Sequence, residues 1–178
     1  MKTAPMKHAI SLLAAALLFG TTLCASAQTQ PATTDHTAHA APATTQALDV
    51  PAAAQAPVAV VDAFGKAIAA SDFAAVEAML DPEVIILETG GAERSRKEYL
   101  SHHAKSDAKF LAGTHSALTH RRARIAGDTA WVASESELHA SKDGKPMTLL
   151  STETMVLDNT ASGWKIVHIH WSSRPKKK

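Results

Sequence analysis

The sequence predicts an α+β fold in which helices come first and an antiparallel sheet follows. Apolar residues recur at helical spacing between Val58 and Leu80, whereas from residue 115 onward alternating segments are separated by turn residues. Helices that precede a meander of strands in this way cover one face of the resulting sheet. We therefore expect a single domain over about residues 58–174, with the helices packed on one side of the strands.

The first 27 residues have the composition of a signal peptide. Lys2 and Lys7 precede an apolar run that is too short to span a bilayer, and Ala25-Ser26-Ala27 has the small residues of a cleavage site. We expect cleavage after Ala27 and a periplasmic or secreted product with no membrane span. Cleavage also removes Cys24, the only cysteine, so we expect no disulfide in the mature chain.

The segments that flank the predicted domain lack the apolar side chains of a core. Residues 28–57 consist largely of Ala, Thr, Gln and Pro, which predicts a disordered tether. Residues 175–178 form a short basic tail. Without the two signal lysines the chain carries 16 basic and 17 acidic residues, so its charge does not indicate a nucleic-acid partner.

Two short helices and a buried strand are expected at the start of the domain. The helices are indicated by two sets of apolar residues at helical spacing, which are Val58, Val61, Phe64 and Ile68, and then Phe73, Val76 and Leu80. Asp81-Pro82 is expected to end the second helix. Residues 83–89, which read EVIILET, then predict a buried strand that ends at Gly90-Gly91.

A third helix is expected to begin at Ser95. Ser95 and Glu98 have the spacing of a capping box, in which the two side chains satisfy backbone amides at a helix start. Tyr99, His103 and Asp107 then recur on one helix face. We expect this face to point into a cavity between helix and sheet. The alternative is that His103 and Asp107 form an ordinary ion pair on the helix surface.

The turns allow the later strands to be aligned. Gly127-Asp128 and Asp143-Gly144 predict two-residue turns, which place Arg121 beside Ser134 and Ser134 opposite Glu153. An even-numbered turn before Gly163 places Glu153 opposite His168. One sheet face is then predicted to carry two polar rows between apolar ends, namely Arg121–Ser134–Glu153–His168 and Thr119–Ser136–Ser151–His170.

Three segments and the order of the elements carry a family resemblance. SRKEYLSHHAKSDAKF, STETMVL and GWKIVHIHWSSR are similar to segments of the NTF2-like (SnoaL-like) superfamily, and within it to DUF4440-like exported bacterial proteins. The resemblance covers residues 58–174. It implies an NTF2-like cone, in which three N-terminal helices pack on the concave face of a strongly bent antiparallel sheet. It also implies a homodimer through the outer sheet face, where Val167 and Trp171 are expected.

The polar rows favour a pocket that binds a small, partly apolar molecule. The candidate lining residues are Tyr99, Arg121, Ser134, Ser136, Ser151, Glu153, His168 and His170. The alternative is a metal-free acid/base enzyme of the isomerase, dehydratase or cyclase type that uses His103–Asp107 or Glu153–His168. A structural dimerisation domain is the second alternative. The superfamily includes proteins of all these kinds, so the resemblance does not decide between them.

Glu153 and the His168-x-His170 pair each allow a further interpretation. A carboxylate on a largely apolar face needs a partner, and an Arg121–Glu153 ion pair is the purely structural alternative to a ligand site. The sequence favours a site without a metal or another cofactor. If a metal does bind, we expect His168 and His170 to be ligands, completed by His103, Asp107 or Glu153.

Overall fold

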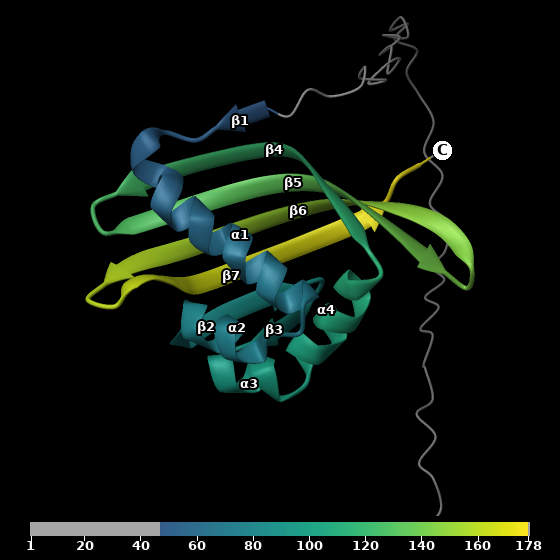
Figure 1. Cartoon of the computed structure of the whole chain (residues 1–178), viewed down its shortest axis with the longest axis horizontal. Helices are drawn as coiled ribbons and strands as arrows, with labels where there is room; N and C mark the ends of the chain where they lie inside the picture. Colours follow the sequence, from purple (N-terminus) through teal and green to yellow (C-terminus); the bar gives the residue numbers. More distant parts are fainter. Residues whose placement is uncertain (1–46, 178) are drawn as a thin grey trace, which may run out of the picture. The chain divides into compact units, whose positions relative to one another are not determined.

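The computed structural model describes residues 47–177 (Figure 1). The predicted signal peptide, its cleavage site and the tether up to residue 46 lie outside the described residues, as does Lys178. The predicted tether boundary at residue 57 is wrong, because residues 47–57 form strand β1 (Ala47–Asp49), the 3-10 helix η1 (Ala52–Ala54) and the start of helix α1. Asp49 anchors this segment to strand β4 (His115–Ala126) through Arg122 and Arg124, at 3.0 and 2.6 Å.

Residues 47–177 contain four α-helices. They are α1 (Gln55–Ala69), α2 (Phe73–Met79), α3 (Arg96–Ser101) and α4 (His103–Ala112). Ser95 caps α3 as predicted, since its hydroxyl accepts a hydrogen bond from the Glu98 amide at 3.1 Å. The helix predicted from residue 95 is divided, because His102 leaves the helical conformation at φ −150° and ψ −41°. No helix within residues 47–177 combines the length and apolar character needed to cross a membrane.

The sheet has seven strands in the order β1-β4-β5-β6-β7-β2-β3. The strands not yet defined are β2 (Leu80–Glu88), β3 (Gly91–Glu93), β5 (Thr129–Lys142), β6 (Lys145–Thr160) and β7 (Gly163–Pro175). The meander β4–β7 is antiparallel as predicted. However, β1 pairs with β4 and β2 pairs with β7 in parallel, which the prediction of an entirely antiparallel sheet did not include. The sheet is curved, and α1 crosses the face formed by β4–β7 (Figure 1).

The hydrophobic core lies between α1, β2 and the end of the meander near the β6–β7 turn. Its largest members are no more than 1 % exposed, and they are Phe64, Ile68, Leu80, Ile86, Tyr99, Met155, Leu157, Ile166 and Ile169. Each such side chain contributes about 1.5–3 kcal/mol by leaving water. The same helix and strands continue beyond this core, where polar residues replace the apolar ones and a cavity forms.

The predicted register is right for the row Arg121–Ser134–Glu153 of β4–β6 and wrong for β7. Arg121 pairs with Ser134, and Ser134 with Glu153, as the two-residue turns require. Glu153, however, lies opposite Trp171 rather than His168. The turn closes at the Thr160–Gly163 pair, and an unbroken ladder from there would place Glu153 opposite His170. A β-bulge, at which Leu157 pairs with Ile166 but Val156 pairs with His168, moves the register one residue further, to Trp171, and changes the face of every later side chain of β7.

A second register shift, in β4, makes the other row differ from the predicted row Thr119–Ser136–Ser151–His170. The shift lies between Leu118 and His120, and it places Leu118 instead of Thr119 opposite Ser136. Ser136 still pairs with Ser151, and Ser151 pairs with Ser173 instead of His170. The rows on the face that α1 covers are therefore Arg121–Ser134–Glu153–Trp171 and Leu118–Ser136–Ser151–Ser173.

His168 and His170 lie on the opposite, outer face of the sheet, so their predicted place in the pocket is wrong. They pair with Ile85 and Leu87 of β2, whose side chains are 47 % and 38 % exposed. His168 Nδ1 also lies 2.9 Å from the carbonyl oxygen of Ile85. Trp171, which was expected on the outer face, points to the inner face instead.

Candidate functional site

An open cavity of about 500 Å³ lies between α1, α4 and the inner face of β4–β7. Its helical wall is largely apolar, with Val61, Phe64 and Ile68 from α1 and Phe110 and Leu111 from α4. The opposite wall is formed by the two cross-strand rows, all eight residues of which line the cavity. We call these two rows the cavity floor.

The cavity floor contains five of the predicted pocket residues, which are Arg121, Ser134, Ser136, Ser151 and Glu153. Trp171 and Ser173 take the positions predicted for His168 and His170, for the register reason given above. Tyr99 is completely buried beneath the cavity and does not line it. A predominantly apolar cavity with a few ordered polar groups is typical of sites that bind small organic molecules.

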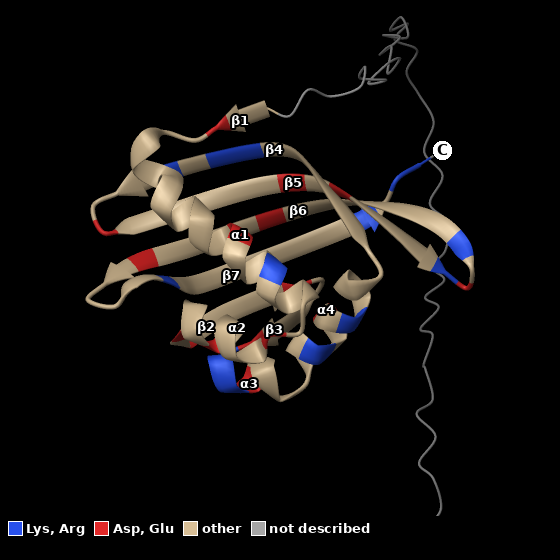
Figure 2. Cartoon of the chain, in the orientation of Figure 1, with Lys and Arg blue, Asp and Glu red and all other residues tan. Residues whose placement is uncertain are grey.

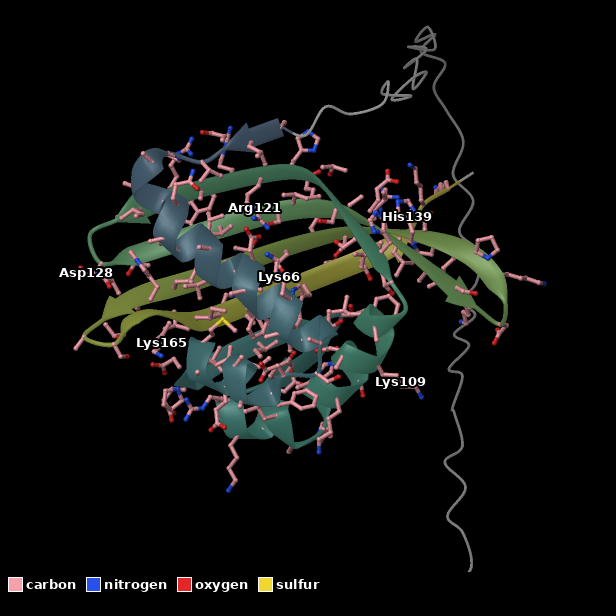
Figure 3. The ribbon with its side chains drawn as sticks, viewed as in Figure 1. Lys66, Lys109, Arg121, Asp128, His139 and Lys165 are labelled. Carbon is pink, nitrogen blue, oxygen red and sulfur yellow. The ribbon has the colours of Figure 1, made fainter. Side chains whose placement is uncertain are left out.

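The charged groups of the cavity floor are paired with neighbours of the fold. Arg121 Nη1 lies 2.7 Å from Asp62 Oδ1 of α1, and Arg121 Nε donates a hydrogen bond to Ser134 Oγ at 3.1 Å. The predicted structural pair Arg121–Glu153 is therefore wrong, because Asp62 is the carboxylate that Arg121 contacts. Figure 2 shows basic positions on β4 and acidic positions on β5 and β6, and Figure 3 labels Arg121 on β4 beside α1.

Glu153 is held by the indole of Trp171. Trp171 Nε1 donates a hydrogen bond to Glu153 Oε2 at 2.9 Å. Burial raises the pKa of Glu153 above its ordinary value, although the Trp171 hydrogen bond and the nearby Arg121 charge oppose this rise. Glu153 is thus a carboxyl group that binds its proton more tightly than an exposed carboxyl group does.

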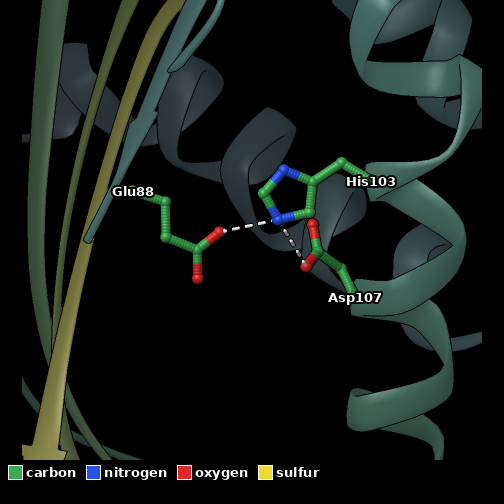
Figure 4. Close-up of side chains that lie close together, drawn as sticks. All are labelled: Glu88, His103 and Asp107. Atoms are coloured by element: carbon green, nitrogen blue, oxygen red, sulfur yellow. Dashed lines mark ion pairs between the residues drawn. The ribbon is translucent and has the colours of Figure 1, made fainter. Parts of the chain in front are cut away.

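Four titratable side chains meet where the β2–β3 hairpin approaches α4, and Figure 4 shows three of them, Glu88, His103 and Asp107. They are Glu88 at the end of β2, Glu93 in β3, and His103 and Asp107 in the first two turns of α4, and we call them the carboxylate–histidine cluster. His103 Nε2 lies 3.1 Å from Glu88 Oε2 and 3.6 Å from Asp107 Oδ1. The other ring nitrogen, Nδ1, contacts Glu93 Oε1. Glu88 and Asp107 also line the cavity.

Tyr99 connects the cluster to the cavity floor. Its hydroxyl donates a hydrogen bond to Asp107 Oδ2 at 2.8 Å, and its ring lies 6.0 Å from the His103 ring and 6.3 Å from the Trp171 ring. Burial and the Asp107 carboxylate raise the pKa of Tyr99, so the hydroxyl stays protonated and serves as a donor. The structure therefore brings together Tyr99, His103 and Asp107 as predicted from their helical spacing.

The cluster contains more negative charge than its single imidazole balances. Burial and the neighbouring carboxylates raise the pKa of Glu88, and burial likewise raises the pKa of Asp107. Burial favours neutral His103, but the hydrogen bond to Glu93 and the charges of Asp107 and Glu88 raise its pKa overall. Such a set of groups is able to transfer protons or to hold a divalent cation, whose usual ligands are imidazole and carboxylate.

Sequence reasoning missed Glu88, Glu93 and Asp62. A signal for Glu93 was present, because a tight β2–β3 hairpin at Gly90-Gly91 pairs it with Ile86 and thereby puts it on the buried face of β2. Glu88 stands at the end of the same apolar strand. The approach of α4 to this hairpin, by contrast, depends on long-range packing that no local pattern expresses.

Comparisons with known proteins agree with this architecture. The family model for the SnoaL-like domain matches residues 58–175. A solved structure described as a putative ketosteroid isomerase from Shewanella frigidimarina is 35 % identical, with a TM-score of 0.66, and the alignment covers 71 % of this chain and all of that one. The S. rosetta CaMKII hub is 27 % identical with a TM-score of 0.61, over 67 % of this chain and 95 % of the hub.

More distant structures share the fold alone. An NTF2-like protein with a cystatin-like fold from Novosphingobium aromaticivorans is 16 % identical, with a TM-score of 0.57, over 66 % of this chain and 79 % of that one. No curated protein sequence matches the chain. These similarities confirm the predicted NTF2-like α+β fold.

Proposed function

We propose that this chain, which belongs to the family of SnoaL-like domains, binds a small, partly apolar molecule in the cavity between α1, α4 and β4–β7. The observation that carries this proposal is the pairing of an apolar helical wall with a polar cavity floor around about 500 Å³ of space. This volume lies within the range of about 300–1,000 Å³ that is usual for ligand pockets. The apolar wall supports binding by burial, and the polar rows support one orientation of the bound molecule.

The chemistry of the cavity agrees with a ligand that has few polar groups. Arg121 is already paired with Asp62, and Glu153 already accepts a hydrogen bond from Trp171, so the cavity floor offers hydrogen bonds more than unpaired charge. The similar structure described as a putative ketosteroid isomerase is named for a largely apolar molecule with a carbonyl group. That similarity supports the same class of ligand here.

Gly65 offers a direct test of the cavity. It lies within α1 and lines the cavity, and a Cβ atom added to it meets no atom within 4 Å. Gly65→Phe should therefore place a ring in the cavity without disturbing the backbone. Gly65→Ala is the matched control. It also removes the helix-destabilising glycine, a gain of about 1 kcal/mol relative to Gly, but its methyl group does not fill the cavity.

The probe is 2-naphthol, a planar apolar molecule with one hydroxyl group, and its binding is followed by its own fluorescence. We expect the wild type and Gly65→Ala to bind it with equal affinity and Gly65→Phe to bind it at least tenfold more weakly. Equal affinity in all three proteins would contradict the proposed location. Native mass spectrometry of the protein as purified from cells then identifies the natural ligand, and Glu153→Gln is expected to weaken its binding while the fold is retained.

Self-association is the second candidate function, and the outer sheet face supports it. Trp131, Val156, His168 and Ile85 lie in one cross-strand row there, and the side chains of Trp131 and Ile85 are 37 % and 47 % exposed. Exposed apolar side chains that adjoin one another are typical of protein interfaces. The similarity to a CaMKII hub supports the same proposal.

Sedimentation of a charge variant tests the proposed homodimer. Ile85→Glu adds a carboxylate to the apolar row and should shift the protein from dimer to monomer in analytical ultracentrifugation. Ser141→Glu adds the same charge at an exposed β5 position outside this row and should leave the dimer intact. A monomeric wild type, or an Ile85→Glu dimer, would refute an interface at this row.

Export is proposed on the amino-terminal sequence alone. Lys2 and Lys7, the apolar run and Ala25-Ser26-Ala27 support removal of residues 1–27 and a periplasmic or secreted location. The intact mass of the protein isolated from cells tests this, because a mature chain should begin at Gln28.

A further inference from the structure

We propose that Glu88, His103 and Asp107 bind a divalent metal ion at the end of the cavity, and that Glu93 and Tyr99 orient two of these ligands. The inference does not depend on the organic ligand proposed above. It also departs from the sequence prediction of a metal-free site, and from the prediction that any metal would be held by His168 and His170.

The three side chains converge from two separate elements on one small space (Figure 4). One nitrogen or oxygen atom of each lies within 4.8 Å of the corresponding atoms of the other two. His103 Nε2 is 3.1 Å from Glu88 Oε2 and 3.6 Å from Asp107 Oδ1. Ligand atoms of a tetrahedral zinc site, at about 2.1 Å from the metal, are separated by about 3.4 Å. The observed distances lie on either side of this value.

Two of the three ligand side chains are held by the kind of hydrogen-bond partner that ligands of a metal site usually have. A metal-binding histidine usually donates its second ring N–H to a carboxylate, which fixes the tautomer and directs the free nitrogen to the metal. Glu93 contacts His103 Nδ1 in this way and leaves Nε2 directed at Glu88 and Asp107. Tyr99 holds Asp107 Oδ2 at 2.8 Å, so that Oδ1 is the oxygen that faces His103.

Two buried oxygen atoms of the cluster lack hydrogen bonds. Glu93 has a side chain that is only 9 % exposed, and its Oε2 has no hydrogen-bond partner. Glu88 Oε2 is also without a hydrogen bond, although it lies 3.1 Å from His103 Nε2, because close approach alone does not satisfy hydrogen-bond geometry. Unpaired buried carboxylate oxygens are costly, and a cation beside Glu88 Oε2 would compensate that atom directly.

The charge of the cluster also favours a divalent cation. Three carboxylates surround one imidazole, and among residues 47–177 no Lys or Arg forms an ion pair with Glu88, Glu93 or Asp107. In the proton-transfer alternative, His103 needs one carboxylate partner, which is Asp107. The two additional carboxylates have no role in such a dyad, whereas a metal ion accounts for both of them.

The ligand types indicate which metals fit. One imidazole and two carboxylates suit zinc and the other divalent metals of the first transition row better than they suit Ca²⁺, which takes only oxygen ligands. Glu88 and Asp107 line the cavity, so the remaining coordination position faces the space proposed for the organic molecule. Three protein ligands with one open position is the arrangement of catalytic rather than structural zinc sites.

Isothermal titration of the metal-free full chain with Zn²⁺ tests the site, and Co²⁺ serves as a spectroscopic probe because its visible absorption reports the ligand geometry. We expect one tight site in the wild type. His103→Ala and Glu88→Gln should each lose more than about 100-fold in affinity, since each lacks a ligand. Glu88→Gln preserves the side-chain volume and removes a repelling charge, so it keeps the test valid if His103→Ala fails to fold.

Two further variants separate this site from zinc binding by other histidines. Glu93→Gln should bind zinc about 10–100-fold more weakly, which is the usual effect of removing a partner of a ligand histidine. His102→Ala removes the adjacent, exposed histidine and should bind zinc as the wild type does. Wild-type affinity and Co²⁺ spectrum in Glu88→Gln or His103→Ala, or no tight site in the wild type, would overturn the proposal and return the cluster to the His103–Asp107 proton-transfer alternative.

Discussion

The cavity floor and the carboxylate–histidine cluster face the same cavity but balance their charges differently. In the cavity floor each charged group has a partner supplied by the fold, since Arg121 pairs with Asp62 and Glu153 accepts a hydrogen bond from Trp171. In the cluster two buried oxygens lack a hydrogen bond. A region that is satisfied internally is suited to a neutral ligand, whereas a region with excess negative charge is suited to a cation.

Tyr99 is the side chain that both regions share, and its removal should have the largest effect. Tyr99→Ala leaves a cavity in the core and deprives Asp107 of its donor, which should lower the free energy of unfolding by about 3–5 kcal/mol. Urea denaturation followed by circular dichroism measures this. Phe110→Ala, at an exposed position of α4, is the control and should change stability by about 0.5 kcal/mol or less. Equal losses would mean that Tyr99 does not connect the two regions energetically.

Zinc should stabilise the protein through the cluster alone. At a free zinc concentration of about 100 times Kd, the free energy of unfolding should rise by about 2.7 kcal/mol, and a chelator should reverse the change. Thermal denaturation with and without zinc measures it. The increase should persist in Glu153→Gln, which alters only the cavity floor, and disappear in Glu88→Gln. A loss in both variants would show that the two regions are not independent.

Removing the hydrogen-bond donor of the cavity floor should have an intermediate effect. Trp171→Phe keeps an aromatic ring but leaves Glu153 Oε2 without its Nε1–H donor, which should cost about 1–3 kcal/mol. Ser141→Ala, at an exposed β5 position outside the proposed interface, is the control and should cost about 0.5 kcal/mol or less. Chemical denaturation of the two variants compares them. A Trp171→Phe loss as small as that of the control would show that Glu153 does not depend on this partner.

The pH dependence of Glu153 should give the smallest effect. Because the pKa of Glu153 is raised in the folded state, the folded protein binds this proton more tightly than the unfolded chain. Its contribution to stability is then greatest below the carboxyl pKa of the unfolded chain and is lost as the pH rises through the higher folded value. Relative to the wild type, Glu153→Gln should thus gain stability as the pH rises from below the ordinary carboxyl pKa through the raised pKa of the folded state. An opposite trend in denaturation measured across this range would show that the partners of Glu153 outweigh its burial.

The sequence predicted those features that depend on local chemistry. The capping Ser95 placed the start of α3, and the Asp143-Gly144 turn fixed the pairing of Lys142 with Lys145 and, through it, that of Ser134 with Glu153. The face shared by Tyr99, His103 and Asp107 followed from helical spacing and survived the break at His102. These features extend over a few residues, within which backbone geometry leaves few alternatives.

The features that were missed arise where distant segments meet. The bulge in β7 has no turn residue to mark it, so the alternation of GWKIVHIHW suggested that His168 belonged to the same face as Ile166. Asp62 became the partner of Arg121 only because α1 lies over β4. The cluster required the β2–β3 hairpin to meet α4, which depends on the packing of the whole core.

The bulge in β7 has a consequence for how this strand tolerates change. The extra residue, Val167, separates the strand into one part that supplies Ile166 to the core and another that supplies Trp171 and Ser173 to the cavity. Deletion of Val167 would exchange the faces of one part and leave the other unchanged. A single insertion or deletion at this point would therefore decide whether β7 presents histidines or an indole to the cavity, while the rest of the fold stays the same.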